Sequence, residues 1–287
     1  MESFGSRLVR SVDERGPLCV GIDPHDHLLA AWGLPQTADG LRAFCDTVVE
    51  AVADRVAVLK PQSAFFERFG SAGIAVLEST IRQSRERGAL VLLDVKRGDI
   101  GSTASAYASA YLDPASALFV DAVTVSPYPG FTALDPFREL AGKHGGGVFV
   151  LAATSNPDGR AVQAARMAGG ETVAQHMVDQ AAAANEGAQP LGDVGVVVGV
   201  TAGEAAVDLS RLNGPVLAPG LGAQGGSADD LAVVFAGVRG LVLPSSSREI
   251  LGQGPDVAAL RDAADTANQA CRRALAVTHS PSWPTPR

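Results

Sequence analysis

Residues 92–107 read L-L-D-V-K-R-G-D-I-G-S-T-A-S-A-Y, and they join a strand-like apolar run to a helix-compatible segment through a charged loop. Asp94 and Lys96 are two residues apart, so in a continuing strand their side chains point to the same side. Val95 then points the other way, toward a layer between strand and helix. The stretch predicts a strand–loop–helix unit with ionisable groups at the carboxyl end of the strand.

The same unit recurs along most of the chain. The strand-like runs are Leu18–Ile22, Val56–Leu59, Ala89–Leu93, Ala122–Val125, Val148–Leu151, Val194–Val200, Val216–Ala218 and Gly240–Leu243. They are mostly continuous apolar runs, as expected for strands that are buried on both faces. Eight such runs alternating with helix-compatible stretches predict an α/β fold, a (β/α)8 TIM barrel. An open doubly wound sheet is the main alternative, but no Gly-x-Gly-x-x-Gly turn follows the first run.

A single catalytic domain is predicted for residues 1–277. No linker or break in composition separates a second domain, and one barrel of this kind runs to roughly 250 residues. We interpret residues 155–192, which are rich in Ala and Gly, as an insertion with at least one helix. Residues 278–287 contain three prolines and cannot continue a helix, so we expect a disordered tail there.

The composition limits the possible partners. Hydrophobic residues make up 46% of the 287 residues and charged residues 19%, which excludes a disordered chain. The net charge of −8 is unfavourable for nucleic-acid binding, which needs cations that neutralise phosphates. The apolar runs are far shorter than a membrane span. We therefore expect no nucleic-acid or membrane partner, whereas a local basic pocket for a small phosphorylated substrate remains compatible.

Cysteine usage and the first residues favour a cytoplasmic protein. Cys19, Cys45 and Cys271 are far apart and odd in number, so neither a disulfide framework nor a clustered zinc site is indicated. The stretch Pro24-His25-Asp26-His27 lacks the further ligands that a zinc site needs, so no metal site is predicted. Residues 1–16 contain no apolar core of a secretory signal.

Three consecutive strand-like runs end in ionisable residues. Asp23 ends the first, Lys60 ends the second, and Asp94 and Lys96 end the third, followed by Asp99 in the loop. Each charge alone is more simply explained as a solvated loop residue. Their coincidence at the mouth where barrel enzymes carry out their chemistry favours a site. Lys60, Asp94, Lys96 and Asp99 would form an alternating array of two cations and two anions. Lysines flanked by carboxylates are held protonated, and carboxylates flanked by ammonium groups are held ionised. Such an array suits the stabilisation of a developing anion rather than Schiff-base chemistry, which needs a neutral amine.

The ends of the seventh and eighth runs suit a phosphate. The glycine-rich stretch Ala218–Gly226 follows the seventh run, and Pro244–Ile250, P-S-S-S-R-E-I, follows the eighth. Loops after strands seven and eight form a recurring phosphate site in barrels. Backbone N–H groups at a helix N-terminus and the Arg248 guanidinium suit a phosphate dianion, and Gln224 could reach over it as a neutral donor. The alternative is a pair of flexible turns with a capping serine.

These residues together resemble a known enzyme family. The pattern Asp94-x-Lys96-x-x-Asp99-Ile100, followed by Gly101-Ser102-Thr103-Ala104, resembles the signature of orotidine 5′-phosphate decarboxylase in its longer bacterial branch. Further matches are Lys60-Pro61-Gln62, Pro219–Gly226 and Ser245-Ser246-Ser247-Arg248. They follow the order of the family across nearly the whole predicted barrel.

The resemblance implies a barrel enzyme that converts orotidine 5′-phosphate to uridine 5′-phosphate and CO2, in pyrimidine biosynthesis, without metal or organic cofactor. It implies that Lys96 donates a proton to pyrimidine C6 and that Asp94 lies by the leaving carboxylate. Lys60 and Asp23 would hold the ribose hydroxyls and the charge array.

The resemblance also implies a homodimer with shared active sites. Asp99, Ile100 and Thr103 would reach into the site of the partner subunit. Ser126 would contact the edge of the pyrimidine. The phosphate would be bound by Gln224 and Arg248, with Pro219 and Ser247 in the matching loops.

Two alternative functions remain. A sugar-phosphate barrel, such as a 3-keto-gulonate-phosphate decarboxylase or a hexulose-phosphate synthase, resembles the chain at Asp-x-Lys-x-x-Asp but uses Mg²⁺, which Lys60 would oppose. A non-catalytic sensor could bind a nucleotide monophosphate through Gln224 and Arg248, although a mere binder has no need for the charged set of Asp94, Lys96 and Asp99.

Overall fold

The strands close into a parallel barrel surrounded by helices. A computed structural model describes residues 1–200, 207–222, 225–238 and 240–276. The strands are β1 (Cys19–Ile22), β2 (Val58–Pro61), β3 (Leu90–Arg97), β4 (Ala122–Val125), β5 (Gly147–Ala153), β6 (Val194–Val198), β7 (Val216–Pro219) and β8 (Val242–Ser246). Across these residues each strand pairs in parallel with the next in sequence, and β8 pairs with β1. The predicted (β/α)8 barrel is thus confirmed, and the open sheet is excluded.

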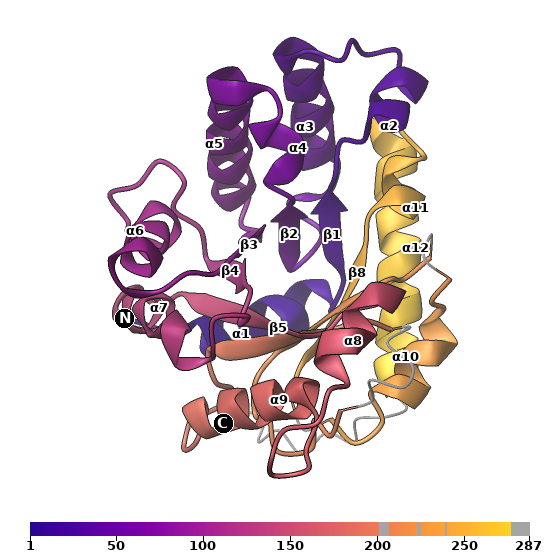
Figure 1. Ribbon diagram of the computed structural model, residues 1–287. Coiled ribbons are helices and arrows are strands. Elements are labelled where there is room, and N and C mark those ends of the chain that lie inside the picture. The colour runs from indigo at the N-terminus through magenta and orange to yellow at the C-terminus, as the bar shows by residue number, and fades with distance from the viewer. Residues whose placement is uncertain (201–206, 223–224, 239, 277–287) are drawn as a thin grey trace.

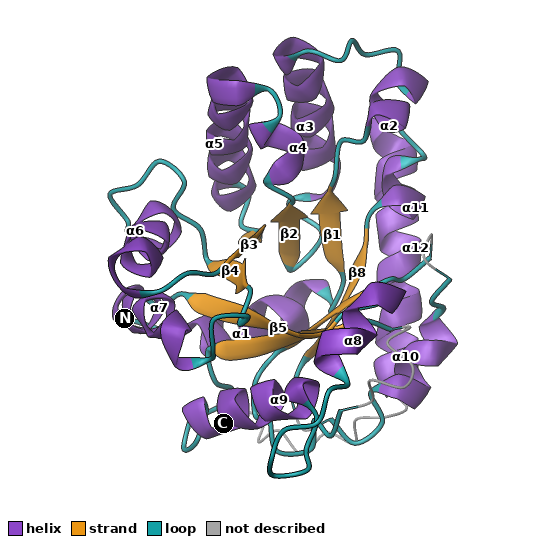
Figure 2. Cartoon of the chain, viewed as in Figure 1, coloured by secondary structure: helices purple, strands orange, loops and turns teal. Residues whose placement is uncertain are grey.

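The helices lie outside the strands (Figures 1 and 2). The longer ones are α1 (Phe4–Arg15), α3 (Ala38–Val52), α5 (Gly70–Glu86), α6 (Gly101–Leu112), α7 (Asp135–His144), α9 (Val173–Ala184), α10 (Ala228–Val234) and α12 (Val257–Ala276). Short ones are α2 (Asp26–Ala31), α4 (Ala64–Glu67), α8 (Arg160–Gln163) and α11 (Arg248–Leu251), with 3-10 turns at Thr132–Leu134 and Pro157–Gly159. No helix among the described residues is long and apolar enough to cross a membrane.

The hydrophobic core lies mainly between the strands and the helices. Val95 is 6% exposed and packs there with Val91 and Leu93, so β3 keeps its predicted alternation through the charged stretch. Both faces of the strands are buried, which explains why they read as continuous apolar runs. Burial of each large aliphatic side chain of this layer contributes about 1.5–3 kcal/mol.

Helix α1 covers the N-terminal end of the barrel. Phe4 and Leu8 pack against the inward-facing residues of the strands, and the ring of Phe4 meets that of Phe149 edge-on with centroids 6.0 Å apart. Arg7 anchors the helix through an ion pair of 2.6 Å with Asp121, a carboxylate that is 3% exposed. With this end filled, the accessible space of the barrel lies at the carboxyl ends of the strands.

Several strands differ in length from the predicted runs. β3 continues through Asp94 and Lys96, and β8 begins at Val242 and continues to Ser246. Backbone pairing explains the extension, because Ser245 and Ser246 pair with the first residues of β1 despite being polar. Apolar composition locates such strands but not their polar ends.

The stretch 155–192 contains more than an insertion. Helix α9 lies within it and packs on β5 and β6 as the regular barrel helix between them. Only the part before Thr172, with the short helix α8, departs from the alternation of strand and helix. The predicted tail, residues 278–287, lies outside the described residues.

Candidate active site

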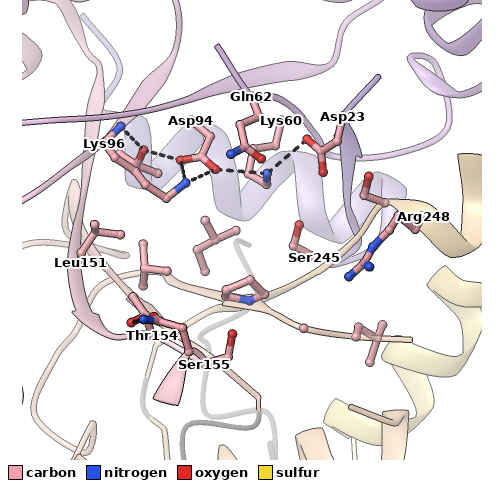
Figure 3. A pocket seen from close by; sticks show the side chains of 18 of the residues that line it. Asp23, Lys60, Gln62, Asp94, Lys96, Leu151, Thr154, Ser155, Ser245 and Arg248 are labelled. Carbon is pink, nitrogen blue, oxygen red and sulfur yellow. Dashed lines mark hydrogen bonds and ion pairs between the residues drawn. The ribbon is translucent and has the colours of Figure 1, made fainter. Parts of the chain in front are cut away.

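A cavity of about 480 Å³ opens at the carboxyl ends of the strands. Its size is within the range of small-molecule sites. One wall carries a row of charged side chains from the first three strands, Lys96, Asp94, Lys60 and Asp23 (Figure 3). Arg248, which follows β8, lies beyond Asp23 at the other end of the row. The barrel thus brings together groups that lie more than 200 residues apart in the chain.

The Asp94 carboxylate is the centre of this row. Lys96 Nζ lies 2.7 Å from Asp94 Oδ1 and 2.6 Å from Oδ2, and Lys60 Nζ lies 3.5 Å from Oδ2. Lys60 Nζ is also 4.0 Å from Asp23 Oδ1. Cations and anions therefore alternate along the row. It contains three of the four residues predicted for the alternating array, Lys60, Asp94 and Lys96, whereas its second carboxylate is Asp23 instead of Asp99.

Burial differs sharply between the two lysines. The side chain of Lys60 is 7% exposed, whereas that of Lys96 is 45% exposed. Lys60 lies between the carboxylates of Asp23 and Asp94 in the wall of the cavity. Both lysines line the cavity, but Lys96 is far more exposed, so its ammonium group is the more accessible of the two to a bound molecule.

The charges of Lys60 and Asp94 sustain each other. Burial alone would lower the pKa of Lys60, but the carboxylates of Asp23 and Asp94 more than offset this effect and raise it above its ordinary value. Burial would likewise raise the pKa of Asp94, but the ammonium groups of Lys60 and Lys96 keep it below its usual range. Near neutral pH Lys60 is thus an ammonium and Asp94 a carboxylate.

Polar groups at the Arg248 end leave room for an anion. Ser247, Pro219 and Gly220 line the cavity beside Arg248. The Ser247 hydroxyl oxygen and Asp23 Oδ1 are buried and make no hydrogen bond to the described residues. Buried polar atoms of this kind normally have partners, so they point to a ligand. Gln224 lies outside the described residues.

Gly21, in β1, leaves the space that Ser247 and Asp23 occupy at the Arg248 end of the cavity. A Cβ on Gly21 would lie 2.8 Å from Ser247 Cβ and 3.0 Å from Asp23 Oδ2. Any larger residue at this position would displace the serine or the carboxylate.

Four predicted site residues lie away from the cavity of this chain. Asp99, Ile100 and Thr103 do not line it, and Ile100 is 64% exposed. The Asp99 carboxylate accepts a hydrogen bond of 2.8 Å from the Ile100 amide at the start of α6. Ser126 also does not line the cavity, and its amide donates to the Arg97 carbonyl. The roles assigned to these residues remain predictions.

The wall opposite the charged row was not predicted. Thr154 and Ser155, which follow β5, lie there (Figure 3), and the next residue, Asn156, also lines the cavity. Gln163 of α8 holds Thr154 by two hydrogen bonds, of 3.0 Å to its amide and 2.7 Å to its hydroxyl. The motif T-S-N-P directly after a strand end was the available signal, because every strand of a barrel ends at the same mouth.

Three further cavity residues lie next to predicted ones in sequence or space. Gln62 lies two residues after Lys60 and forms a bridge with Asp94 in parallel register. His25 packs edge-on against Phe65 with ring centroids 4.4 Å apart. Thr124 of β4 lies beside Asp94, with its hydroxyl 2.7 Å from the carboxylate.

The donor set does not suit a metal ion. Among the described residues no group of three or more His, Cys, Asp or Glu side chains is arranged to hold one. Lys60 occupies the space between the carboxylates of Asp23 and Asp94, where a cation would otherwise lie. The row instead presents a fixed ammonium group beside a fixed carboxylate, an arrangement that can stabilise a developing negative charge and supply a proton to it.

Comparison with known proteins identifies relatives along almost the entire chain. A model of the orotidine 5′-phosphate decarboxylase / HUMPS family matches residues 16–263, which include both the charged row and Arg248. An orotidine 5′-phosphate decarboxylase from Salinispora arenicola is 68% identical over 275 residues, 96% of this chain and 99% of the relative. One from Streptomyces coelicolor is 57% identical over 265 residues, 92% of this chain and 95% of the relative.

Solved structures share the fold. One is the crystal structure of a protein from Streptomyces avermitilis, which was provisionally assigned as an orotidine 5′-phosphate decarboxylase. Its TM-score to this chain is 0.93 at 56% identity, and the match covers 96% of this chain and 97% of that one. An OMP decarboxylase from Leishmania donovani has a TM-score of 0.71 at 30% identity, with coverage of 96% and 98%.

The charge of Asp94 makes a testable contribution to stability. Because its pKa is lower in the folded than in the unfolded chain, this contribution is full above the unfolded value of about 3.9 and is lost as pH falls through the folded value. We expect Asp94→Asn to lower the free energy of unfolding at pH 7 by roughly 3 kcal/mol, the low end for a buried pair that loses one partner, since Asp23 still faces Lys60. Urea unfolding between pH 7 and pH 3 should show the difference from wild type shrinking below about pH 4. A difference that stays constant over this range would contradict the assignment.

Proposed function

Because the chain belongs to the orotidine 5′-phosphate decarboxylase / HUMPS family, we propose that it converts orotidine 5′-phosphate to uridine 5′-phosphate and CO2. The enzyme is then a carboxy-lyase of pyrimidine biosynthesis. The observation that carries the proposal is the Lys60–Asp94–Lys96 row in a cavity that ends at Arg248. This arrangement offers a charged reaction centre and a separate cation for the phosphate.

Lys96 is assigned as the proton donor. When the bond between C6 and the carboxylate breaks, CO2 leaves and the electron pair remains on C6. An ammonium group held beside that carbon stabilises the charge and then transfers a proton to it, leaving a neutral amine that solvent reprotonates. The exposed Lys96 suits this role better than Lys60, which is enclosed by two carboxylates.

Asp94 is assigned to the side of the leaving carboxylate. It accepts two short hydrogen bonds from Lys96 and so fixes the direction of the ammonium group. Lys60 and Asp23, which follow in the row, are assigned to the ribose hydroxyls. Asp23 Oδ1 supports this assignment, since it is a buried acceptor that faces Lys60 at 4.0 Å but accepts no hydrogen bond from the described residues.

The other end of the cavity is assigned to the phosphate. Arg248 provides a guanidinium group, and the Ser247 hydroxyl is free of partners among the described residues. Pro219 lines the same end, and Gln224 is proposed to contribute from the following loop. Binding energy gained at the phosphate can be used to hold the pyrimidine against Lys96.

We further propose a homodimer in which Asp99, Ile100 and Thr103 complete the partner's site. Ile100 and Thr103 are exposed, and Asp99 is partly exposed, just beyond the end of β3. A second copy of the chain that covers Ile100 would explain why this large apolar side chain is exposed so soon after β3. The contact of Ser126 with the pyrimidine edge is likewise part of the proposal, although this residue does not line the cavity.

The proposal is tested directly with purified protein and orotidine 5′-phosphate. We expect the absorbance of the substrate to change to that of uridine 5′-phosphate, with the same rate in EDTA and after addition of Mg²⁺. A requirement for Mg²⁺ with turnover of a sugar phosphate would instead indicate the alternative barrel activity. Binding of nucleotide without turnover would indicate a sensor.

The role of Lys96 predicts a selective loss in the variant Lys96→Ala. Removing one group that stabilises a developing charge should lower kcat by at least ~10²–10³-fold, while a phosphate-containing ligand still binds through Arg248. Steady-state kinetics and calorimetric titration with uridine 5′-phosphate measure the two effects. Lys143→Ala, at an exposed position of α7, is the control. Turnover of Lys96→Ala at the wild-type rate would reject the role.

A shared site predicts complementation between inactive variants. Mixed Lys96→Ala and Asp99→Ala subunits should regain part of the activity, because one of the two sites in a mixed dimer would be intact. The assay follows decarboxylation after the variants are mixed and allowed to exchange subunits. No recovery at any ratio, although exchange is demonstrated, would contradict the shared site.

A further inference from the structure

One buried hydroxyl group connects the two residues of the reaction centre. Thr124, in the middle of β4, is 1% exposed. Its Oγ1 donates a hydrogen bond of 2.7 Å to Asp94 Oδ1 and accepts one of 3.0 Å from the backbone N–H of Lys96. A single oxygen atom thus contacts the Asp94 side chain and the Lys96 main chain at the same time.

The direction of these bonds is determined. The Lys96 amide can only donate, so the hydroxyl oxygen must accept from it. The hydroxyl hydrogen is then free to point at Asp94, which as a carboxylate can only accept. Asp94 Oδ1 receives both this hydrogen and that of the Lys96 ammonium group, which fixes where the carboxylate lies.

The contact lies where the pairing of β3 and β4 is irregular. Leu93 pairs with Val123 and Arg97 pairs with Val125, so three residues of β3 stand opposite Thr124 alone. Within this bulge Lys96 has φ 46°, a backbone conformation that residues with a side chain seldom adopt. The Lys96 amide has no regular ladder partner there, and the threonine hydroxyl takes that place.

We propose that Thr124 is a positioning residue, which holds the bulge of β3 so that Lys96 and Asp94 meet at the reacting carbon. The inference rests on the proposed decarboxylase function. Without the hydroxyl, the Lys96 amide and one side of Asp94 each lose a partner. The Lys96 side chain, already half exposed, is then free to move away from its working position.

The experiment compares hydroxyl-bearing and hydroxyl-free side chains at this position. Thr124→Val keeps the shape and removes the oxygen, while Thr124→Ser keeps the oxygen. Thr80→Val is the matched control, because Thr80 is also 1% exposed and its hydroxyl bonds to the Val76 carbonyl in α5, away from the cavity. Circular dichroism checks the fold of each variant, and kcat and KM are measured for decarboxylation.

We expect Thr124→Val to lower kcat about tenfold to a hundredfold, as for loss of a hydrogen bond to a charged group, with KM nearly unchanged. Thr124→Ser should retain most of the wild-type kcat, and Thr80→Val should leave kcat unaltered. If Thr124→Val does not fold, the comparison of Thr124→Ser with Thr124→Ala decides, since these differ only in the hydroxyl group.

Three results would overturn the inference: a wild-type kcat in folded Thr124→Val, a kcat of Thr124→Ser as low as that of Thr124→Ala, or a change confined to KM. Wild-type protein in the same assay separates the two claims. Absence of wild-type turnover refutes the proposed function, whereas normal wild-type turnover with an equally active Thr124→Val refutes only the role of Thr124.

Discussion

The Asp94 carboxylate, held between the ammonium groups of Lys96 and Lys60, is the interaction on which the site depends. It lies in a barrel mouth where burial would favour the protonated acid, and the two cations reverse that preference. Lys60 in turn stays charged despite its burial because Asp94 and Asp23 face it. Removing Asp94 or Lys60 leaves the other of the two buried groups with one opposite charge instead of two.

The barrel fold places the charged groups together at one end of the strands. Helix α1 fills the N-terminal end with Phe4 and Leu8, so the polar groups gather at the other end. Parallel strands deliver residues from distant parts of the chain to one rim, where Arg248 stands across from Lys96. In the proposed reaction, the two ends of the row would give the phosphorylated substrate two separate anchor points. Binding energy at one of them can then be used at the other.

The backbone is irregular at the proposed reaction centre. Lys96 takes a positive φ in a bulge of β3, and the alternation of side chains nevertheless continues through Val95. Strained positions of this kind are commonly found at functional sites, where the surrounding structure holds them in place. Here the neighbouring strand provides the support through one threonine hydroxyl.

The barrel and the charged row could be predicted from local features of the chain, namely the apolar runs and the ionisable residues that follow them. Asp23, Lys60, Asp94, Lys96 and Arg248 were identified from their places after strands, and all of them line the cavity. Other residues of the cavity were identified only from the three-dimensional arrangement of the strands. The contact of the Thr124 hydroxyl with Asp94 and Lys96 depends on the irregular pairing of β3 with β4. The sequence also did not show that Ser126 lies outside the cavity. A bulge is defined by the pairing of one strand with its neighbour, so the sequence of β3 read alone does not show it.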